Sequence, residues 1–113
     1  SIYGLVAPDQ HIYEGTDMQT EPDYPYTKGG MIMFSKYLAS LFAKDKIRVN
    51  CIAPGGFFNN QSEPFLRQYV AKVPLGRMAE ADDIKGAAVF LGSDASRYIT
   101  GTVIPIDGGF TIV

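Results

Sequence analysis

The sequence predicts an α/β fold built on a doubly wound parallel β-sheet. Stretches with helical periodicity alternate along the chain with short runs rich in β-branched residues, an order typical of parallel sheets. The run IRVNCIAP at 47–54 is mostly apolar, as is typical of a strand buried in a parallel sheet. Only two or three such strands are present, so we expect them to form part of a sheet with an open edge.

The N-terminal third is predicted to contain one long loop and one long helix. SIYG at 1–4 is interpreted as the end of a strand, and the stretch that follows, to residue 23, shows neither hydrophobic period. A helix is predicted over 24–44, with apolar positions spread more widely than a single amphipathic stripe. We therefore expect this helix to cover the sheet on one side and to meet another subunit on the other.

The C-terminal half is predicted to contain two further helices and a last strand. EPFLRQYVAKV at 63–73 is typical of a short helix with Pro64 in its first turn. The stretch 79–94 opens with acidic residues, which stabilise a helix N-terminus. GTVIPIDGG at 101–109 is predicted to be the final strand, where Pro105 indicates an edge or a bulge.

Composition narrows the class of protein. The 113 residues amount to one domain at most, and 46% hydrophobic residues with 19% charged residues indicate a chain able to bury a core. A net charge of −2 with scattered basic residues argues against a nucleic-acid or anionic-membrane surface. The single cysteine, Cys51, excludes an internal disulfide and fits a reducing cytoplasm, and with His11 as the only histidine no metal site is expected.

The stretch DYPYTKGG at 23–30 carries the residues with the clearest chemical potential. Tyr24 and Lys28 are four positions apart and so share one helix face, whereas Tyr26 lies two positions from Lys28 and faces elsewhere. A free tyrosine, with a pKa of about 10, is a poor base at neutral pH, and a nearby ammonium favours its phenolate. Spacing therefore selects Tyr24 as a candidate acid/base, although such a pair also occurs by chance on solvated helix faces.

Several motifs together resemble the short-chain dehydrogenase/reductase family. YPYTKGG is similar to the family's Tyr-x-x-x-Lys element, and IRVNCIAPGGF is similar to its Arg-Val-Asn-x-Ile-x-Pro-Gly strand and turn. The run from PLGRMAEADDIKG to VIPIDGG resembles the family's C-terminal segment, and SIYG resembles the end of the strand that carries its catalytic serine. The resemblance covers the whole chain in the family's order, and it implies a Rossmann-like fold.

The resemblance implies roles for three catalytic residues. Tyr24 matches the family's acid/base, which protonates a carbonyl oxygen during reduction or accepts the alcohol proton during oxidation. Lys28 matches the lysine that assists this tyrosine and hydrogen-bonds the nicotinamide ribose. Ser1 aligns with the serine that hydrogen-bonds the substrate oxygen.

The resemblance also implies NAD or NADP as cofactor. Tyr24 and Lys28 are expected to contact it, with Pro54 and Gly55 forming the turn that lets the backbone approach the nicotinamide. Phe57 falls where an aliphatic residue usually offers its backbone to the carboxamide, and Asn59 falls where the family often has threonine. The residue that separates NAD from NADP in the family has no counterpart in this chain.

The segment between Ser1 and Tyr24 departs from the family pattern. It has 22 residues, more than the family usually has, and the excess PDQHIYEGTDMQTEP is expected beside the active-site mouth. Some members that act on sugars or sugar acids, including enzymes linked to flagellin glycosylation, have a similar insertion. Its polar residues are either hydrogen-bonding groups for a polyol or parts of a solvated loop; they are Asp9, His11, Tyr13, Glu14 and Asp17.

A further departure concerns the glycine-rich turn that receives the cofactor pyrophosphate, for which these residues contain no match. We therefore interpret 1–113 as the C-terminal half of one Rossmann domain, with the catalytic and substrate-binding part. The expected function is NAD(P)-dependent hydride transfer between the nicotinamide and a carbonyl or secondary alcohol of a sugar, sugar acid or polyol, in a homo-oligomer. The alternatives are a non-catalytic dinucleotide-binding homologue and an inactive truncated fragment.

Three residues of the 63–73 segment are further candidates for substrate contact or for plain helix surface: Arg67, Gln68 and Tyr69.

Overall fold

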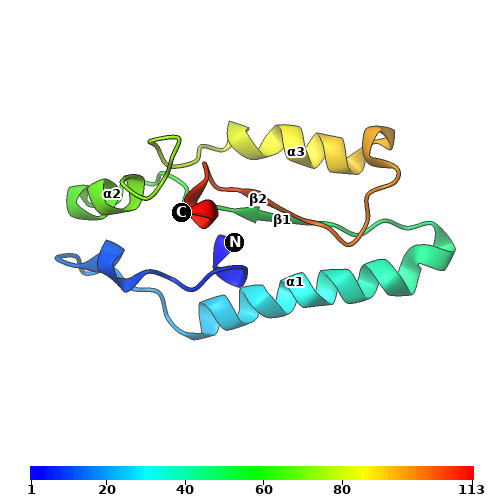
Figure 1. Cartoon of the computed structure of the whole chain (residues 1–113), viewed down its shortest axis with the longest axis horizontal. Coiled ribbons are helices and arrows are strands. Elements are labelled where there is room, and N and C mark those ends of the chain that lie inside the picture. The colour runs from blue at the N-terminus through cyan, green and yellow to red at the C-terminus, as the bar shows by residue number, and fades with distance from the viewer.

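The structure is a computed structural model that describes all residues from 1 to 113 (Figure 1). Two parallel strands run between helix α1 on one side of the view and helix α3 on the other, with the short helix α2 beyond one end of the strands. The predicted α/β class with a parallel sheet is confirmed. The helices and strands are α1 Asp23–Phe42, β1 Cys51–Pro54, α2 Glu63–Val70, α3 Asp82–Gly92 and β2 Val103–Ile106.

The two strands pair in register from Cys51 opposite Val103 to Pro54 opposite Ile106. Both are shorter than the predicted runs, and before the start of each strand a side chain takes the place of part of the ladder. The side chain of Asn50 donates to the Ile99 carbonyl at 3.0 Å and accepts from the Thr102 amide at 3.1 Å. These side-chain bonds take the place of backbone pairing at the Ile99 carbonyl and the Thr102 amide, while the Gly101 amide still donates to the Val49 carbonyl at 2.7 Å.

Residues 1–4 do not end a strand, so that prediction is wrong. Ile2–Gly4 form a 3₁₀ helix, and the Ser1 hydroxyl accepts a hydrogen bond from the Tyr3 amide at 3.2 Å. Such local bonds from serine side chains compete with extended pairing. The Ile2 side chain, 2% exposed, is buried in the core by this turn.

The expected loop that follows is also more ordered than the sequence indicates. Gln10–Tyr13 form a second 3₁₀ helix, whose first turn is capped by the Asp9 carboxylate accepting from the His11 amide at 3.0 Å. Ile12 is 1% exposed and belongs to the main hydrophobic core. One apolar side chain therefore anchors a segment that shows no hydrophobic period.

The helices α2 and α3 form where expected but within narrower bounds. The predicted helix at 63–73 ends at Val70, shortly before the Val73–Pro74 step, where helical backbone is disfavoured. The start of α3 is delayed to Asp82 because Ala79 is held in a β-bridge with Phe57. The acidic start of α3 and the position of Pro64 in the first turn of α2 are as predicted.

The hydrophobic core lies where α2, the N-terminal 3₁₀ turns and the C-terminus meet. Three aromatic contacts run through it, with ring centroids 5.7 Å apart from Tyr13 to Phe65, 5.6 Å from Phe65 to Tyr69 and 5.0 Å from Tyr69 to Phe110. This cluster joins three segments that are distant in sequence. Its buried members are Ile2, Ile12, Phe65, Tyr69, Val73, Met78 and Phe110.

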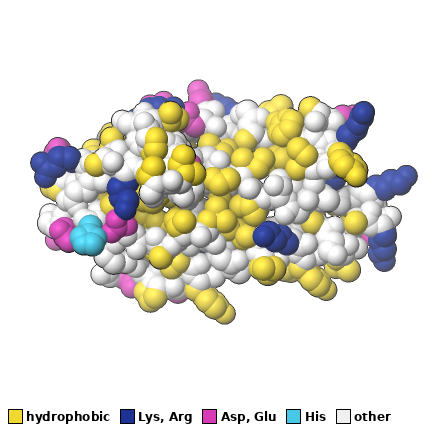
Figure 2. Space-filling model, viewed as in Figure 1, with side chains coloured by type: hydrophobic (Ala, Val, Ile, Leu, Met, Phe, Trp, Pro, Cys, Tyr) yellow, Lys and Arg dark blue, Asp and Glu magenta, His cyan; other side chains and the backbone are white.

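The two long helices contribute little to that core. Figure 2 shows hydrophobic side chains standing out along the α1 edge of the molecule. On α1, Phe34 is 58% exposed and Tyr37 is 60% exposed, and on α3, Val89 is 72% exposed. Exposed apolar side chains therefore lie on both long helices, in line with the wide apolar distribution predicted for α1. None of the helices combines the length and apolarity that crossing a membrane requires.

Candidate functional site

The first two turns of α1 place Tyr24 and Lys28 together. The Lys28 Nζ atom lies 5.1 Å from the centroid of the Tyr24 ring. Tyr24 is 43% exposed, whereas Tyr26 is 84% exposed. The four-residue spacing thus brings Tyr24, and not Tyr26, against the ammonium, as expected for one face of a helix.

The turn that begins at Ser1 packs on the same end of α1. The Tyr3 ring meets the Tyr24 ring edge to face, with centroids 6.4 Å apart and planes at 84°. Gly4 makes this approach possible, because a Cβ atom there would lie 2.7 Å from the carbonyl carbon and oxygen of Lys28. Ser1 and Tyr24 are consequently held on one wall of a shared cavity.

That cavity, of about 610 Å³, is the larger of the two main cavities. Among the residues with predicted roles, Ser1, Tyr24, Gly55 and Phe57 line it, and Lys28, Pro54 and Asn59 do not. The remaining lining residues come from the 3₁₀ turns, the insertion, the start of α1, the Gly56 turn and its loop, α2 and the segment after α2: Ile2, Tyr3, Tyr13, Gln19, Thr20, Glu21, Asp23, Gly56, Gln61, Phe65, Tyr69 and Met78.

The turn after β1 exposes main chain to this cavity. The Gly55 amide donates to the Ile106 carbonyl at 2.9 Å, which continues the sheet pairing by one residue. The Gly56 amide donates to the Tyr69 hydroxyl, and the Gly56 carbonyl accepts from the Ala79 amide at 2.9 Å. A Cβ atom on Gly56 would lie 2.8 Å from the Tyr69 ring, so these contacts require glycine.

Tyr69 is therefore a buried support for the Gly55–Gly56 turn. Burial raises the pKa of its hydroxyl, an effect that the hydrogen bond from the Gly56 amide partly offsets. The phenol stays neutral and accepts from the turn. Of the three candidates in the predicted 63–73 helix, Tyr69 lines the cavity, whereas Arg67 and Gln68 do not.

Asn59 lies on the exposed loop after the turn, outside the cavity lining. Its amide donates to the Gln61 side-chain oxygen at 2.8 Å, and the Gln61 side-chain nitrogen donates to the Phe57 carbonyl at 2.7 Å. Gln61 thus replaces Asn59 as the polar side chain of this loop that lines the cavity.

The insertion forms a wall of the cavity through only part of its polar residues. The Tyr13 hydroxyl lies 3.2 Å from the Tyr3 hydroxyl and also hydrogen-bonds the Thr20 hydroxyl. Burial, followed by the hydrogen bond with Tyr13, raises the pKa of Tyr3. Of the five insertion residues singled out from the sequence, only Tyr13 lines the cavity; the other four, Asp9, His11, Glu14 and Asp17, lie outside it.

Asp9 instead fastens the insertion to the segment that follows α2. Its carboxylate pairs with the Lys72 ammonium and lies 2.9 Å from His11 Nδ1. The Gln68 side-chain nitrogen adds a hydrogen bond to the Glu14 carbonyl at 2.9 Å. The wall of the cavity is therefore supported from behind by α2.

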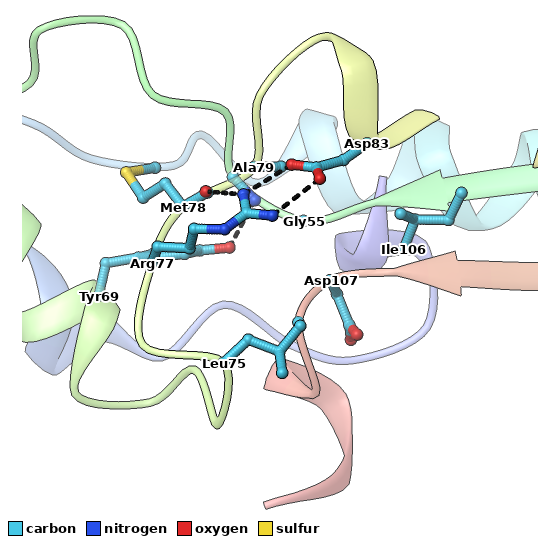
Figure 3. Close-up of a pocket in the computed structure, with 11 residues that line it drawn as sticks. Gly55, Tyr69, Leu75, Arg77, Met78, Ala79, Asp83, Ile106 and Asp107 are labelled. Atoms are coloured by element: carbon cyan, nitrogen blue, oxygen red, sulfur yellow. Dashed lines mark hydrogen bonds and ion pairs between the residues drawn. The ribbon is translucent and has the colours of Figure 1, made fainter. Parts of the chain in front are cut away.

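A second, smaller cavity of about 120 Å³ lies behind the glycine turn (Figure 3). Arg77 and Asp83 close one side of it with two hydrogen bonds of 2.7 and 2.8 Å. Gly55, Gly56, Tyr69 and Met78 line both cavities, so they form the partition between them. No group of three or more histidine, cysteine, aspartate or glutamate side chains is arranged to hold a metal ion.

Sequence reasoning missed several residues of the large cavity. Gln19, Thr20 and Glu21 lie within the insertion, but a segment without periodicity gives no sign of which side chains face inward. Gly56 carried a usable signal, because a second glycine directly after a strand often marks close backbone approach.

Residues 12–111 match the family described as enoyl-(acyl carrier protein) reductase. The chain belongs to the short-chain dehydrogenase/reductase family. It is 49% identical to a short chain dehydrogenase from Leptospira borgpetersenii solved with bound NAD⁺, with a TM-score of 0.89 over 98% of this chain and 42% of that one. The RhlG/NADP active-site complex of Pseudomonas aeruginosa is 30% identical, with a TM-score of 0.77 over 97% of this chain and 43% of that one.

Among curated family members, the post-translational flagellin modification protein A of Campylobacter coli is 38% identical over 110 residues. That match covers 97% of this chain and 43% of the relative. The chain thus spans about two fifths of the length of the short-chain dehydrogenases that it matches. The Rossmann-like class expected from the motifs is confirmed by this structural likeness.

Proposed function

We propose that residues 1–113 form the C-terminal, catalytic half of a Rossmann domain in an NAD(P)-dependent oxidoreductase. The reaction is hydride exchange between a nicotinamide and a carbonyl or secondary alcohol carbon. The observation that carries the proposal is the convergence of Ser1 and Tyr24, with Lys28 beside the tyrosine, on a cavity walled by the Gly55–Gly56 backbone.

Each polar group has a separate task in this scheme. The Tyr24 hydroxyl gives a proton to the carbonyl oxygen during reduction and takes it back during oxidation. Lys28, with its Nζ atom 5.1 Å from the Tyr24 ring centroid, stabilises negative charge on the phenol. Ser1, on the same cavity wall, donates a hydrogen bond to the substrate oxygen and so fixes it beside Tyr24.

The chain fits the nicotinamide end of a dinucleotide. When bound, NAD or NADP supplies the hydride donor or acceptor. The side-chain-free wall at Gly55 lets a flat ring approach the main chain, and Phe57 lines the same wall. Tyr24 and Lys28 face the ribose in this arrangement, whereas Pro54 shapes the turn and Asn59 supports its outer loop.

The whole protein's substrate, assembly and location are part of the proposal. A sugar, sugar acid or polyol is supported by the polar insertion and by similarity to a flagellin modification protein. A homo-oligomer is supported by the exposed apolar side chains of α1 and α3. A cytoplasmic location is supported by the single cysteine, Cys51.

Substitution of Tyr24 by phenylalanine tests the proposal in the full-length protein. The Tyr24→Phe variant keeps the ring that contacts Tyr3 and Lys28 but loses the exchangeable proton. We expect kcat to fall by about 10²- to 10⁴-fold, the usual contribution of general acid–base catalysis. The dissociation constant for NADH or NADPH, measured by fluorescence titration, should stay within a few-fold of the parent value.

Tyr26→Phe is the matched control, because Tyr26 lies on the same turn but is 84% exposed. It should leave kcat and the dissociation constant for NADH or NADPH unchanged. A parent protein that binds dinucleotide, turns over no alcohol or ketone and loses affinity on Tyr24→Phe substitution would instead be a non-catalytic binding protein.

A further inference from the structure

The residues of the insertion that line the large cavity indicate which class of substrate it binds, and this inference rests on the proposed function. We propose that the insertion selects a polyhydroxylated alcohol or ketone that bears no anionic group, through Tyr13, Thr20 and Glu21. Sugar acids, which the sequence left open beside sugars and polyols, are therefore excluded as preferred substrates.

The first argument is the row of hydroxyl groups on the insertion side. Tyr3, Tyr13 and Thr20 form a continuous hydrogen-bonded chain that lines the cavity together with Ser1 and Tyr24. A hydroxyl both donates and accepts, so a chain of three can re-orient to match the hydroxyls of a bound polyol. An apolar substrate would bury these groups without replacing the hydrogen bonds that water gives them.

The second argument is charge. Within residues 1–113, the cavity lining includes two acidic residues, Glu21 and Asp23, and no lysine, arginine or histidine; the Lys28 ammonium beside Tyr24 lies outside this lining. Gln19, which also lines the cavity, donates to the Glu21 carboxylate and holds it in place. Recognition of carboxylate or phosphate normally relies on arginine or lysine. An anionic substrate would meet like charge here, whereas hydroxyl or ammonium groups would find acceptors.

The third argument is that this wall is anchored. Ile12 is 1% exposed in the core, and the Tyr13 ring packs on Phe65 with centroids 5.7 Å apart. Behind the wall, Gln68 donates to the Glu14 carbonyl and Asp9 pairs with Lys72. Groups fixed in advance bind with a smaller loss of conformational freedom, so they discriminate between substrates more sharply.

The test compares initial rates of cofactor reduction by the full-length protein with matched alcohols. Three hexitols, sorbitol, mannitol and galactitol, are set against their aldonates, gluconate, mannonate and galactonate, and against cyclohexanol. Each aldonate replaces a terminal CH₂OH by a carboxylate and changes nothing else. We expect kcat/KM of the best hexitol to exceed that of the best aldonate, and that of cyclohexanol, by about tenfold or more, the value of one good hydrogen bond.

Three conservative variants then assign the effect to the insertion. Tyr13→Phe keeps the ring on Phe65, and Thr20→Val keeps the shape of the side chain, but each removes one hydroxyl. Both should lower kcat/KM for hexitols about tenfold and leave cyclohexanol within twofold. Glu21→Gln removes a negative charge from the cavity, so it should lower the ratio of kcat/KM for hexitols to kcat/KM for aldonates. Glu14→Gln is the matched control, because that carboxylate is 72% exposed and lies outside the cavity.

The outcomes separate this inference from the function on which it rests. Absence of turnover with every compound, cyclohexanol included, overturns the proposed function and this inference with it. Turnover of cyclohexanol or an aldonate in preference to the hexitols overturns the inference alone. If Tyr13→Phe and Thr20→Val lowered kcat/KM equally for hexitols and for cyclohexanol, Tyr13 and Thr20 would have only structural roles. That result also overturns the inference.

Discussion

At the scale of single residues, Gly4 controls how closely the Ser1 turn approaches α1. An added Cβ atom would meet backbone, at 2.7 Å from the carbonyl carbon and oxygen of Lys28, and the Ile32 side chain at the same distance. Backbone cannot rotate away as a flexible side chain can. Any larger residue must therefore separate Ser1 from Tyr24 and Lys28.

Substitution of Gly4 by alanine should weaken both stability and catalysis in the full-length protein. Overpacking of this kind costs about 1–3 kcal/mol, and displacement of Ser1 should lower kcat. Thermal unfolding and initial rates check the two effects. Gly30→Ala is the matched control on α1: nothing lies within 4 Å of its added Cβ atom, and alanine in a helix interior stabilises by about 0.5–1 kcal/mol. If Gly4→Ala behaved like Gly30→Ala, the close packing of this turn would be wrong.

At the scale of elements, the insertion is fastened to the end of α2 by a charge cluster that depends on pH. Hydrogen bonds from Lys72 and then His11 hold the pKa of Asp9 below its ordinary value of 3.8. The hydrogen bond to Asp9 raises the pKa of His11 above its ordinary value of 6.5. Both side chains lie near the surface, so salt weakens their attraction.

The signs of these two pKa shifts define the pH range in which the amides of residues 9–14 should be best protected from hydrogen exchange. The contribution of Asp9 is present above pH 3.8 and is lost as pH falls toward its lowered pKa. The contribution of His11 is complete below pH 6.5 and is lost as pH rises through its raised pKa. Hydrogen exchange at the Glu14 amide, corrected for intrinsic rates, should be slowest near pH 5 and faster at pH 8. His11→Gln should abolish that difference; a variant that kept it would exclude His11 as its source.

At the scale of the whole molecule, the 113 residues form an elongated layer with little interior. The extents are 51 × 27 × 23 Å, and the radius of gyration is 15.6 Å, against about 13 Å for a compact domain of this length. Only 11 of 113 residues are buried, and most apolar side chains of α1 and α3 are partly or largely exposed. The open edges of the two-stranded sheet add unpaired backbone groups.

Produced alone, the polypeptide 1–113 should associate. Sedimentation velocity at increasing concentration is expected to give a mass above 12.3 kDa that rises with concentration. Phe34→Lys, which places a charge on the exposed face of α1, should reduce that association, whereas Gln10→Lys, at an exposed polar residue outside α1, should not. A monodisperse monomer of 12.3 kDa with one cooperative melting transition would contradict the expectation.

The sequence predicted what depends on local chemistry and periodicity. The placement of Tyr24 against Lys28 follows from the spacing within one helix, and the α/β class and the parallel pairing follow from the alternation of helical and strand patterns along the chain. What it did not predict depends on long-range contacts. The bonds of Asn50 to Ile99 and Thr102 replace part of the backbone pairing before both strands. Likewise, only burial of Ile12 against distant core residues shows which face of the insertion meets the cavity.

The insertion begins and ends beside the reacting groups, but it carries none of them. Ser1 is held by its own 3₁₀ turn, and Tyr24 and Lys28 by α1, so the segment between them is a module that can diverge while the chemistry stays constant. Ile12 is its most deeply buried side chain, at 1% exposed, and it packs in the core. Directed evolution or loop grafting should therefore redesign selectivity here first, retaining an apolar residue at 12 and randomising 19–21.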